Sequence, residues 1–121
     1  MAQNVGDELH ARTVWFEGCE RVPSLVATTD SEDPDTVWVD VREVWMHMEG
    51  NNDAGPRFGV LSWAYRIVLG PVAVPWPTSV EQIASHFPQV ESHHFDTFVH
   101  HVEQTRRVRE SFRRLRERRQ G

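Results

Sequence analysis

Two stretches in the middle of the chain alternate apolar and polar side chains with the period of two that is typical of β-strands. In the first, residues 36–49, the small apolar side chains begin on odd positions and continue on even ones: Val37, Val39, Val41, then Val44, Met46 and Met48. Because a strand cannot change phase without an inserted residue, we predict a β-bulge near Arg42-Glu43.

The second stretch, residues 58–69, has the cleanest alternation in the chain. Its odd positions are all large and apolar: Leu61, Trp63, Tyr65, Ile67 and Leu69. We expect this face to cover the core. Since residues 50–56 are rich in turn-forming Gly, Asn, Asp and Pro, the two stretches are predicted to form one long antiparallel hairpin.

Weaker patterns lie on both sides of this hairpin. Short strands are predicted at residues 12–17 and 24–29, where β-branched and other apolar residues gather. After the hairpin, three prolines in residues 70–77 exclude a helix and a central strand. We therefore predict an extended crossover there, with Trp76 packed on the domain.

Two helices are predicted to follow. The first lies within residues 78–87 and ends before Pro88. Two candidate pairs could form its capping box, Ser79 with Gln82 and Thr78 with Glu81. The second begins between Gln89 and Ser92 and runs to about Arg119.

The last helix changes its apolar face along its length. The first half carries one face, made of Phe95, Phe98, Val99 and Val102, and the second half carries another, made of Val108, Phe112 and Leu115. At 100° per residue the two faces are rotated by roughly 120°. A straight helix cannot bury both against one sheet. Unless the helix kinks, we expect the first half to dock on its own domain and the second half to offer its face elsewhere.

Strands followed by helices predict an α+β fold: an antiparallel sheet of three to four strands followed by a short helix and a long C-terminal helix. Charge divides the same chain unevenly. Residues 1–102 hold five Arg and 15 acidic residues, whereas residues 103–121 hold eight Arg and three Glu, and the chain has no Lys. We therefore predict an acidic α+β domain at residues 1–104, which includes the first half of the last helix, and a basic Arg-rich helical tail at residues 105–121.

An apolar stripe flanked by arginines is typical of a helix that binds a partner protein or a second copy of its own chain. The residues expected to make this contact are Val108, Phe112, Leu115, Arg109, Arg113 and Arg116. Nucleic acid would bind arginines and leave the stripe unused, and the candidate polyanion contacts are Arg106, Arg107, Arg114, Arg118 and Arg119. The acidic domain and the lack of a known nucleic-acid-binding motif weigh against this second interpretation.

Two further interpretations of the tail stay open. An anionic membrane would take the stripe into its interface. Alternatively, the tail is a solvated helix whose charges pair along one turn: Glu103 with Arg107, Glu110 with Arg106 and Arg114, and Glu117 with Arg113.

Histidines and acids in the last helix raise the question of a metal site. His93, Asp96, His100 and Glu103 share one helical face, and such side chains suit Zn, Mn, Fe or Ni. A metal site usually needs ligands from a second helix or strand, and this row lies on the side of the helix opposite Phe95 and Val102, which are expected to dock on the domain. We therefore interpret it as a solvated polar face and predict no cofactor. No nucleotide-binding, nucleophile or zinc-protease motif is present, so we do not expect an enzyme; a small metal-dependent enzyme is the enzymatic alternative.

The sequence predicts a non-enzymatic interaction or assembly protein that uses its basic helix to self-associate or dock on a partner. A nucleic-acid-binding regulator is the second interpretation. The chain has no secretory signal and no apolar stretch of about 18 residues, and Cys19 has no second cysteine to pair with. We expect a cytoplasmic location, or the virion if a phage encodes the protein. The absence of Lys fits a GC-rich genome, that of a bacterium or its phage.

Overall fold

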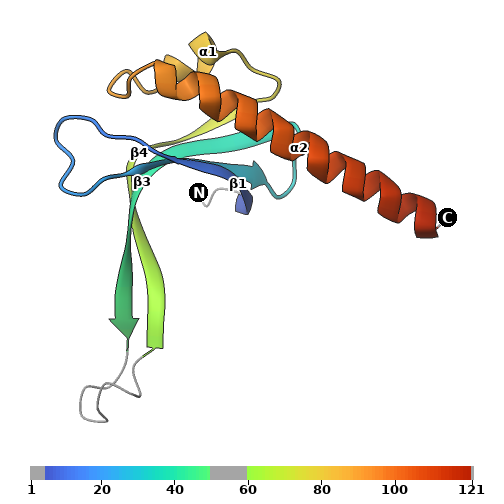
Figure 1. Cartoon of the computed structure of the whole chain (residues 1–121), viewed down its shortest axis with the longest axis horizontal. Coiled ribbons are helices and arrows are strands. Elements are labelled where there is room, and N and C mark those ends of the chain that lie inside the picture. The colour runs from blue at the N-terminus through green and yellow to red at the C-terminus, as the bar shows by residue number, and fades with distance from the viewer. Residues whose placement is uncertain (1–4, 50–59, 121) are drawn as a thin grey trace.

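The computed structural model describes residues 5–49 and 60–120 and has a four-stranded antiparallel sheet, a short helix and a long C-terminal helix (Figure 1). The elements are β1 (Val5–Thr13), β2 (Ser24–Asp30), β3 (Thr36–Glu49), β4 (Val60–Pro75), α1 (Val80–Ala84) and α2 (His93–Gln120). The predicted α+β class is confirmed. Among the described residues, none of the helices combines the length and the apolar character needed to cross a membrane.

The sheet is a meander in which each strand pairs with the next, in the order β1-β2-β3-β4. β2 pairs with β3 only as far as Arg42, whereas β3 and β4 stay paired to Glu49 and Val60. Residues 43–49 and 60–66 therefore leave the sheet as a two-stranded extension, which we name the hairpin arm (Figure 1).

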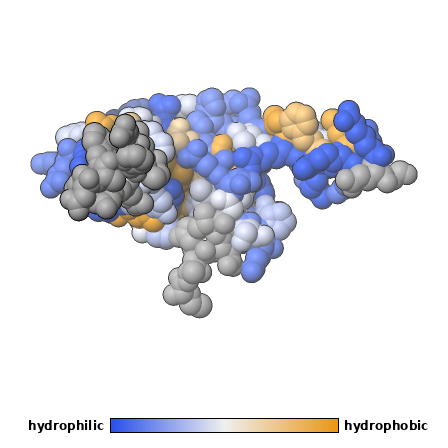
Figure 2. Space-filling view, turned by 90° about the horizontal axis from the view of Figure 1, so that it is seen from below, coloured by the Kyte–Doolittle hydropathy of each residue, from blue (hydrophilic) through white to orange (hydrophobic). Residues whose placement is uncertain are grey.

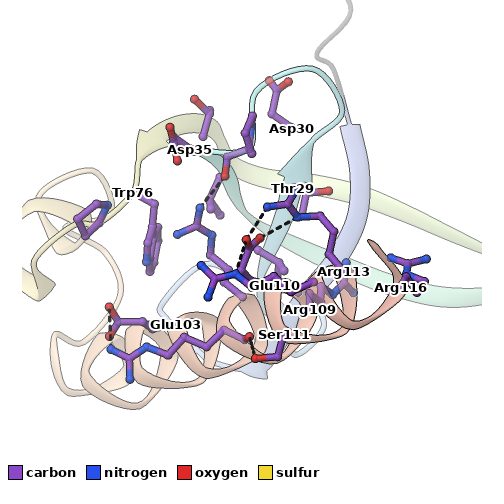
Figure 3. A pocket seen from close by; sticks show the side chains of 18 residues that line it. Thr29, Asp30, Asp35, Trp76, Glu103, Arg109, Glu110, Ser111, Arg113 and Arg116 are labelled. Atoms are coloured by element: carbon purple, nitrogen blue, oxygen red, sulfur yellow. Dashed lines mark hydrogen bonds and ion pairs between the residues drawn. The ribbon is translucent and has the colours of Figure 1, made fainter. Parts of the chain in front are cut away.

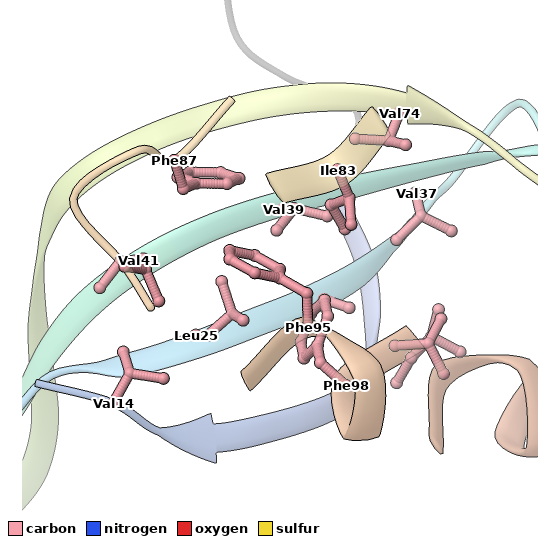
Figure 4. Packing of buried hydrophobic residues seen from close by; sticks show 14 of the residues in the cluster. Val14, Leu25, Val37, Val39, Val41, Val74, Ile83, Phe87, Phe95 and Phe98 are labelled. Atoms are coloured by element: carbon pink, nitrogen blue, oxygen red, sulfur yellow. The ribbon is translucent and has the colours of Figure 1, made fainter. Parts of the chain in front are cut away.

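The core lies between one face of the sheet and the two helices (Figure 4). The strands contribute Leu25, Val37, Val39, Val41 and Val74, and Val14 joins them from just after β1. Phe95 and Phe98 of α2 are fully buried against them, together with Ile83 of α1. The first half of α2 is thus the lid of the core, as its apolar spacing predicts.

The predicted irregularity between β3 and β4 exists, but the extra residues lie in β4. Val39 is opposite Val72, Val41 is opposite Leu69, and the next residue, Arg42, is opposite Ile67. Between these pairs β4 has more residues than β3, so the bulged strand is β4. The shifts come just before the predicted Arg42-Glu43 position.

These shifts overturn the prediction that all odd residues of 58–69 cover the core. Leu69 faces the core beside Val41, but Ile67 is opposite Arg42 and therefore points to the other face of the sheet. From there outward, Trp63 and Tyr65 lie on the solvent side and are 71% and 56% exposed.

Two other strand predictions were wrong in their bounds. The first strand is Val5–Thr13, rather than residues 12–17. β4 runs to Pro75 through the predicted crossover, and the sheet tolerates its prolines because β4 is an edge strand. The packing of Trp76 on the domain is confirmed, since its side chain is buried.

Both helices begin close to their predicted starts. Ser79 caps α1, and its hydroxyl accepts a hydrogen bond from the Gln82 backbone N–H while the Gln82 side chain accepts one from the Ser79 N–H. This is the first of the two predicted capping boxes. α2 begins at His93, just after the predicted range, and runs without interruption to Gln120.

Candidate interaction surface on the distal half of helix α2

Helix α2 divides into a docked half and a projecting half. Phe95, Phe98 and Val102 are fully buried on the domain. The C-terminal part of the helix extends past the sheet and away from it (Figure 1). We name residues 106–120 the distal helix.

The distal helix carries an apolar stripe that no described residue covers. Val108, Phe112 and Leu115 are 53%, 61% and 47% exposed. Figure 2 shows apolar surface on the projecting end of the molecule, bordered by hydrophilic side chains. The predicted second apolar face is therefore present, and it lies in solvent.

Two arginines tie the start of the distal helix to the domain. Arg106 donates from Nη2 to the Pro34 carbonyl oxygen at 2.6 Å, and its guanidinium lies 5.9 Å from the centre of the Trp76 ring. Arg109 donates to the Glu8 carbonyl oxygen at 2.9 Å and lies 3.5 Å from an Asp7 carboxylate oxygen. Arg106, a candidate polyanion contact, and Arg109, a candidate partner contact, are thus engaged with their own domain.

Other arginines pair with acids of the same helix. Arg113 donates to Glu110 at 3.0 Å and to Glu117 at 3.1 Å, and Arg114 donates to Glu110 at 3.3 Å. The pKa of Glu110 is lowered, chiefly by the hydrogen bond from Arg113 and also by the charges of Arg113 and Arg114. The predicted pairs of Glu117 with Arg113 and Glu110 with Arg114 are confirmed.

Of the two remaining predicted pairs, one forms and the other does not. Arg107 lies 3.8 Å from Glu103, as expected, but Arg106 reaches the domain instead of Glu110. Arg116, Arg118 and Arg119 are exposed and have no ion pair with any residue that the structure describes. The free positive charge of the distal helix is therefore concentrated at its C-terminal end.

An open groove of about 1120 Å³ separates the distal helix from the turn between β2 and β3 (Figure 3). Asp30 and Asp35 line one wall, and Arg109 and Arg113 line the other. The pKa of Asp30 is lowered by hydrogen bonds, first from the Glu32 backbone N–H and then from the Trp38 indole, so the carboxylate stays ionised near neutral pH. The opposed charges attract the distal helix toward the turn.

The candidate row of His93, Asp96, His100 and Glu103, interpreted from the sequence as a solvated polar face, does not converge on one point. His93 lies 3.2 Å from Glu91, Asp96 and His100 point to solvent, and Glu103 pairs with Arg107. A different group, Glu91, His93 and His94, brings its ligand atoms within 4.8 Å of one another.

This second group is poorly suited to a cation. His94 Nδ1 accepts a hydrogen bond from Arg12 Nε at 3.3 Å, so the neutral ring carries its proton on Nε2. A metal would have to displace either that proton or the Arg12 contact. His94 and Arg12 instead form a polar contact between α2 and β1.

Sequence reasoning missed a second exposed apolar surface, on the hairpin arm. Its members are Val44, Met46, Trp63 and Tyr65, and we name them the arm face. The register places Val44 opposite Tyr65 and Met46 opposite Trp63, so all four side chains lie on one side of the ribbon. The available signal was the change of parity at Val44, which marks the residues that turn away from the core.

Fold and surface together define an α+β domain with a basic amphipathic helical extension and an apolar hairpin arm. Comparisons of the chain with protein-family models, curated proteins and solved structures found no match. Its function is therefore argued from the chemistry of these surfaces.

Proposed function

We propose that this is a non-enzymatic assembly protein whose distal helix joins one copy of the chain to another protein chain, in the first place a second copy of itself. The observation that carries the proposal is the exposed stripe of Val108, Phe112 and Leu115 on a helix that extends beyond its own domain. Removing such side chains from water is the main favourable contribution to association.

A protein partner would contact both the apolar stripe and the arginines of the distal helix, whereas the other ligands would use only some of these features. Nucleic acid would engage Arg116, Arg118 and Arg119 but would leave the stripe in water. An anionic membrane could take up the stripe, but it would also bring the acidic domain against a surface of like charge. A protein partner can bury the stripe and pair the arginines at its rim.

The test is the solution mass of the full chain, of Phe112→Ser/Leu115→Ser and of a chain that ends at Thr105, measured by light scattering over a salt series. The full chain is expected to be an oligomer, and both altered proteins are expected to be monomers. The double variant should keep the native circular dichroism, and the shortened chain should lose only the helical signal of residues 106–120. Both removed side chains are exposed, so the fold should survive the double substitution. A full chain that stays monomeric at every salt concentration, or a double variant that still associates, would refute the proposal.

A nucleic-acid-binding regulator is the alternative, favoured by the three unpaired arginines at the end of α2. It predicts tight binding of a DNA or RNA duplex that weakens steeply as salt rises. Neutralising Arg116, Arg118 and Arg119 with glutamine would abolish that binding, while Phe112→Ser/Leu115→Ser would leave it unchanged. Measured fluorescence anisotropy of a labelled duplex separates this alternative from assembly.

A further inference from the structure

The hairpin arm is supported on one side and uncovered on the other. On its supported side, Glu43 accepts hydrogen bonds from Arg66 at 2.9 Å and from the Arg21 backbone N–H at 3.4 Å. The Arg21 guanidinium also lies 4.8 Å from the centre of the Trp45 ring. The loop between β1 and β2 thus holds the arm from one side, while the side chains of the arm face on the other side are largely exposed to solvent.

We propose that the arm face of one copy binds the distal helix of the next copy, so that the chain assembles head to tail. This inference rests on the proposed function, in which the distal helix joins copies of the chain, and it names the surface that the helix contacts.

Charge argues against the simplest alternative, a symmetric pair of distal helices. Residues 103–121 hold eight Arg and three Glu, so two such segments side by side would bring two net charges of +5 together. In a parallel pair, the unpaired Arg116 and the arginines that follow it would lie next to their own copies. Repulsion of this kind favours a contact in which the helix meets a different surface.

The arm face offers what the distal helix needs. Its members are apolar or aromatic, and they can cover Val108, Phe112 and Leu115. The cation closest to the arm face is already neutralised: Arg42 donates to both carboxylate oxygens of the buried Asp40, at 2.7 and 2.5 Å. The helix arginines therefore meet no strong positive charge there among the described residues.

The arm face also provides rings that accept a guanidinium group. Arg42 already lies 4.4 Å from the centre of the Tyr65 ring, a distance typical of cation–π attraction. Trp63, the most exposed large apolar residue of the described chain, is the stronger acceptor by ring type. An arginine beside the stripe, such as Arg116, can stack on it while Phe112 and Leu115 cover the neighbouring apolar side chains.

The distal helix of one copy cannot contact the arm face of the same copy. The hairpin arm and the distal helix leave the domain in different directions (Figure 1). A contact between them must form between copies, and each copy then keeps one helix and one arm for further neighbours. Such a heterologous contact closes into a ring or continues as an open filament, depending on the rotation between neighbours.

Complementary variants test this arrangement in the full-length protein. The helix variant is Phe112→Ser/Leu115→Ser, the arm variant is Met46→Ser/Trp63→Ser, and the control is Trp15→Ser, which alters a Trp that is 57% exposed on neither surface. Light scattering and analytical ultracentrifugation give the mass of each protein and of equimolar mixtures. Circular dichroism confirms that each is folded.

Head-to-tail assembly predicts that the helix variant and the arm variant are each monomers, and that their mixture forms a 1:1 dimer through the one remaining intact pair of surfaces. The Trp15→Ser control keeps the wild-type mass. If the arm variant associates like the wild type while the helix variant does not, the proposed function stands and this inference is overturned. A monomeric wild type refutes both. Two monomeric variants that do not dimerise when mixed overturn the inference alone.

Discussion

The imidazole ring of His10 in β1 stacks on that of His101 in α2, with 4.8 Å between the ring centres and 8° between their planes. Phe98 lies beside the pair, 5.8 Å from His10. His10 Nε2 is buried and has no hydrogen-bond partner in the described chain. The contact between the sheet and its covering helix therefore includes a pair of histidines. If either ring is protonated, the other cannot neutralise its positive charge.

This contact makes stability depend on pH. The pKa of His10 is lowered, first by burial and then by the positive charges of His101 and Arg12, against a smaller opposing effect of Glu8. The pKa of His94 is lowered by burial, then by His93 and Arg12, with Glu91 opposing. Both groups bind protons more readily in the unfolded chain, where the pKa is about 6.5. The free energy of unfolding should therefore fall as the pH drops below about 6.5.

Urea denaturation at pH 7.5 and pH 5 measures this fall. The comparison protein is His10→Phe, which keeps a ring beside His101 but cannot be protonated, and its stability should change less over the same interval. Asp30, Asp33 and Glu110 do not confound the result, because their pKa values are lowered and they stay ionised at pH 5. Equal pH dependence in the two proteins would contradict a role for His10.

The two halves of α2 should respond differently to the same substitution. Phe98→Ala removes a fully buried ring and should lower the free energy of unfolding by about 3–5 kcal/mol. Phe112→Ala removes a ring that is mostly exposed and should change it by less than about 0.5 kcal/mol in the monomer. Urea denaturation at low protein concentration gives both values, and similar losses would mean that the distal helix belongs to the core.

Loss of the Asp40 carboxylate should destabilise the centre of the sheet. Its two hydrogen bonds hold the Arg42 guanidinium where it also contacts Tyr65. Asp40→Asn leaves a partly buried cation without its counter-charge and should cost about 1.5–3 kcal/mol in denaturation. Arg66→Gln is the matched control: it breaks a pair whose Arg66 side chain is mostly exposed, and it should cost less than about 1 kcal/mol.

Gly70 should resist substitution more strongly than Gly18. Both have a positive φ, of 86° and 98°, so alanine costs roughly 1–2 kcal/mol at either position. At Gly70 an added Cβ would also lie 2.9 Å from the Val39 carbonyl oxygen, whereas nothing lies within 4 Å at Gly18. Thermal melting should therefore show a clearly larger loss for Gly70→Ala, and equal losses would mean that β4 can relax at its bulge.

The periodicity of apolar residues correctly predicted those parts of the fold in which the sequence pattern matches the pattern of buried and exposed side chains. The two faces of α2 follow directly from the spacing of Phe95, Phe98 and Val102 and of the stripe residues. The bounds of β3 were likewise predicted, because turn-forming residues flank it on both sides.

The first strand could not be predicted in the same way. β1 contains mostly polar residues and is interrupted by register shifts around Glu8, so its alternation is hidden. Val14-Trp15-Phe16 has the stronger strand propensity, yet it lies after β1 and leaves Trp15 in solvent. Tertiary pairing overrides local propensity in both cases.

The candidate surfaces were only partly predictable, because their surroundings depend on residues far apart in the chain. Arg106 and Pro34 are 72 positions apart, and Arg109 and Glu8 are 101 apart. The arm face depends on extra residues in β4 that reverse which side of the ribbon Trp63 occupies. A pattern read from one strand cannot reveal a shift that exists only in its pairing with another.

The prolines of β4 have a consequence for how this protein behaves at high concentration. Pro71 and Pro75 have no backbone N–H, so a foreign strand aligned with this edge would find donors missing from its ladder. At the opposite edge, the irregular register of β1 presents no evenly spaced template. Copies should therefore not pair edge to edge along the four-stranded part of the sheet, and the cross-β growth that gives amyloid its permanence should not begin there.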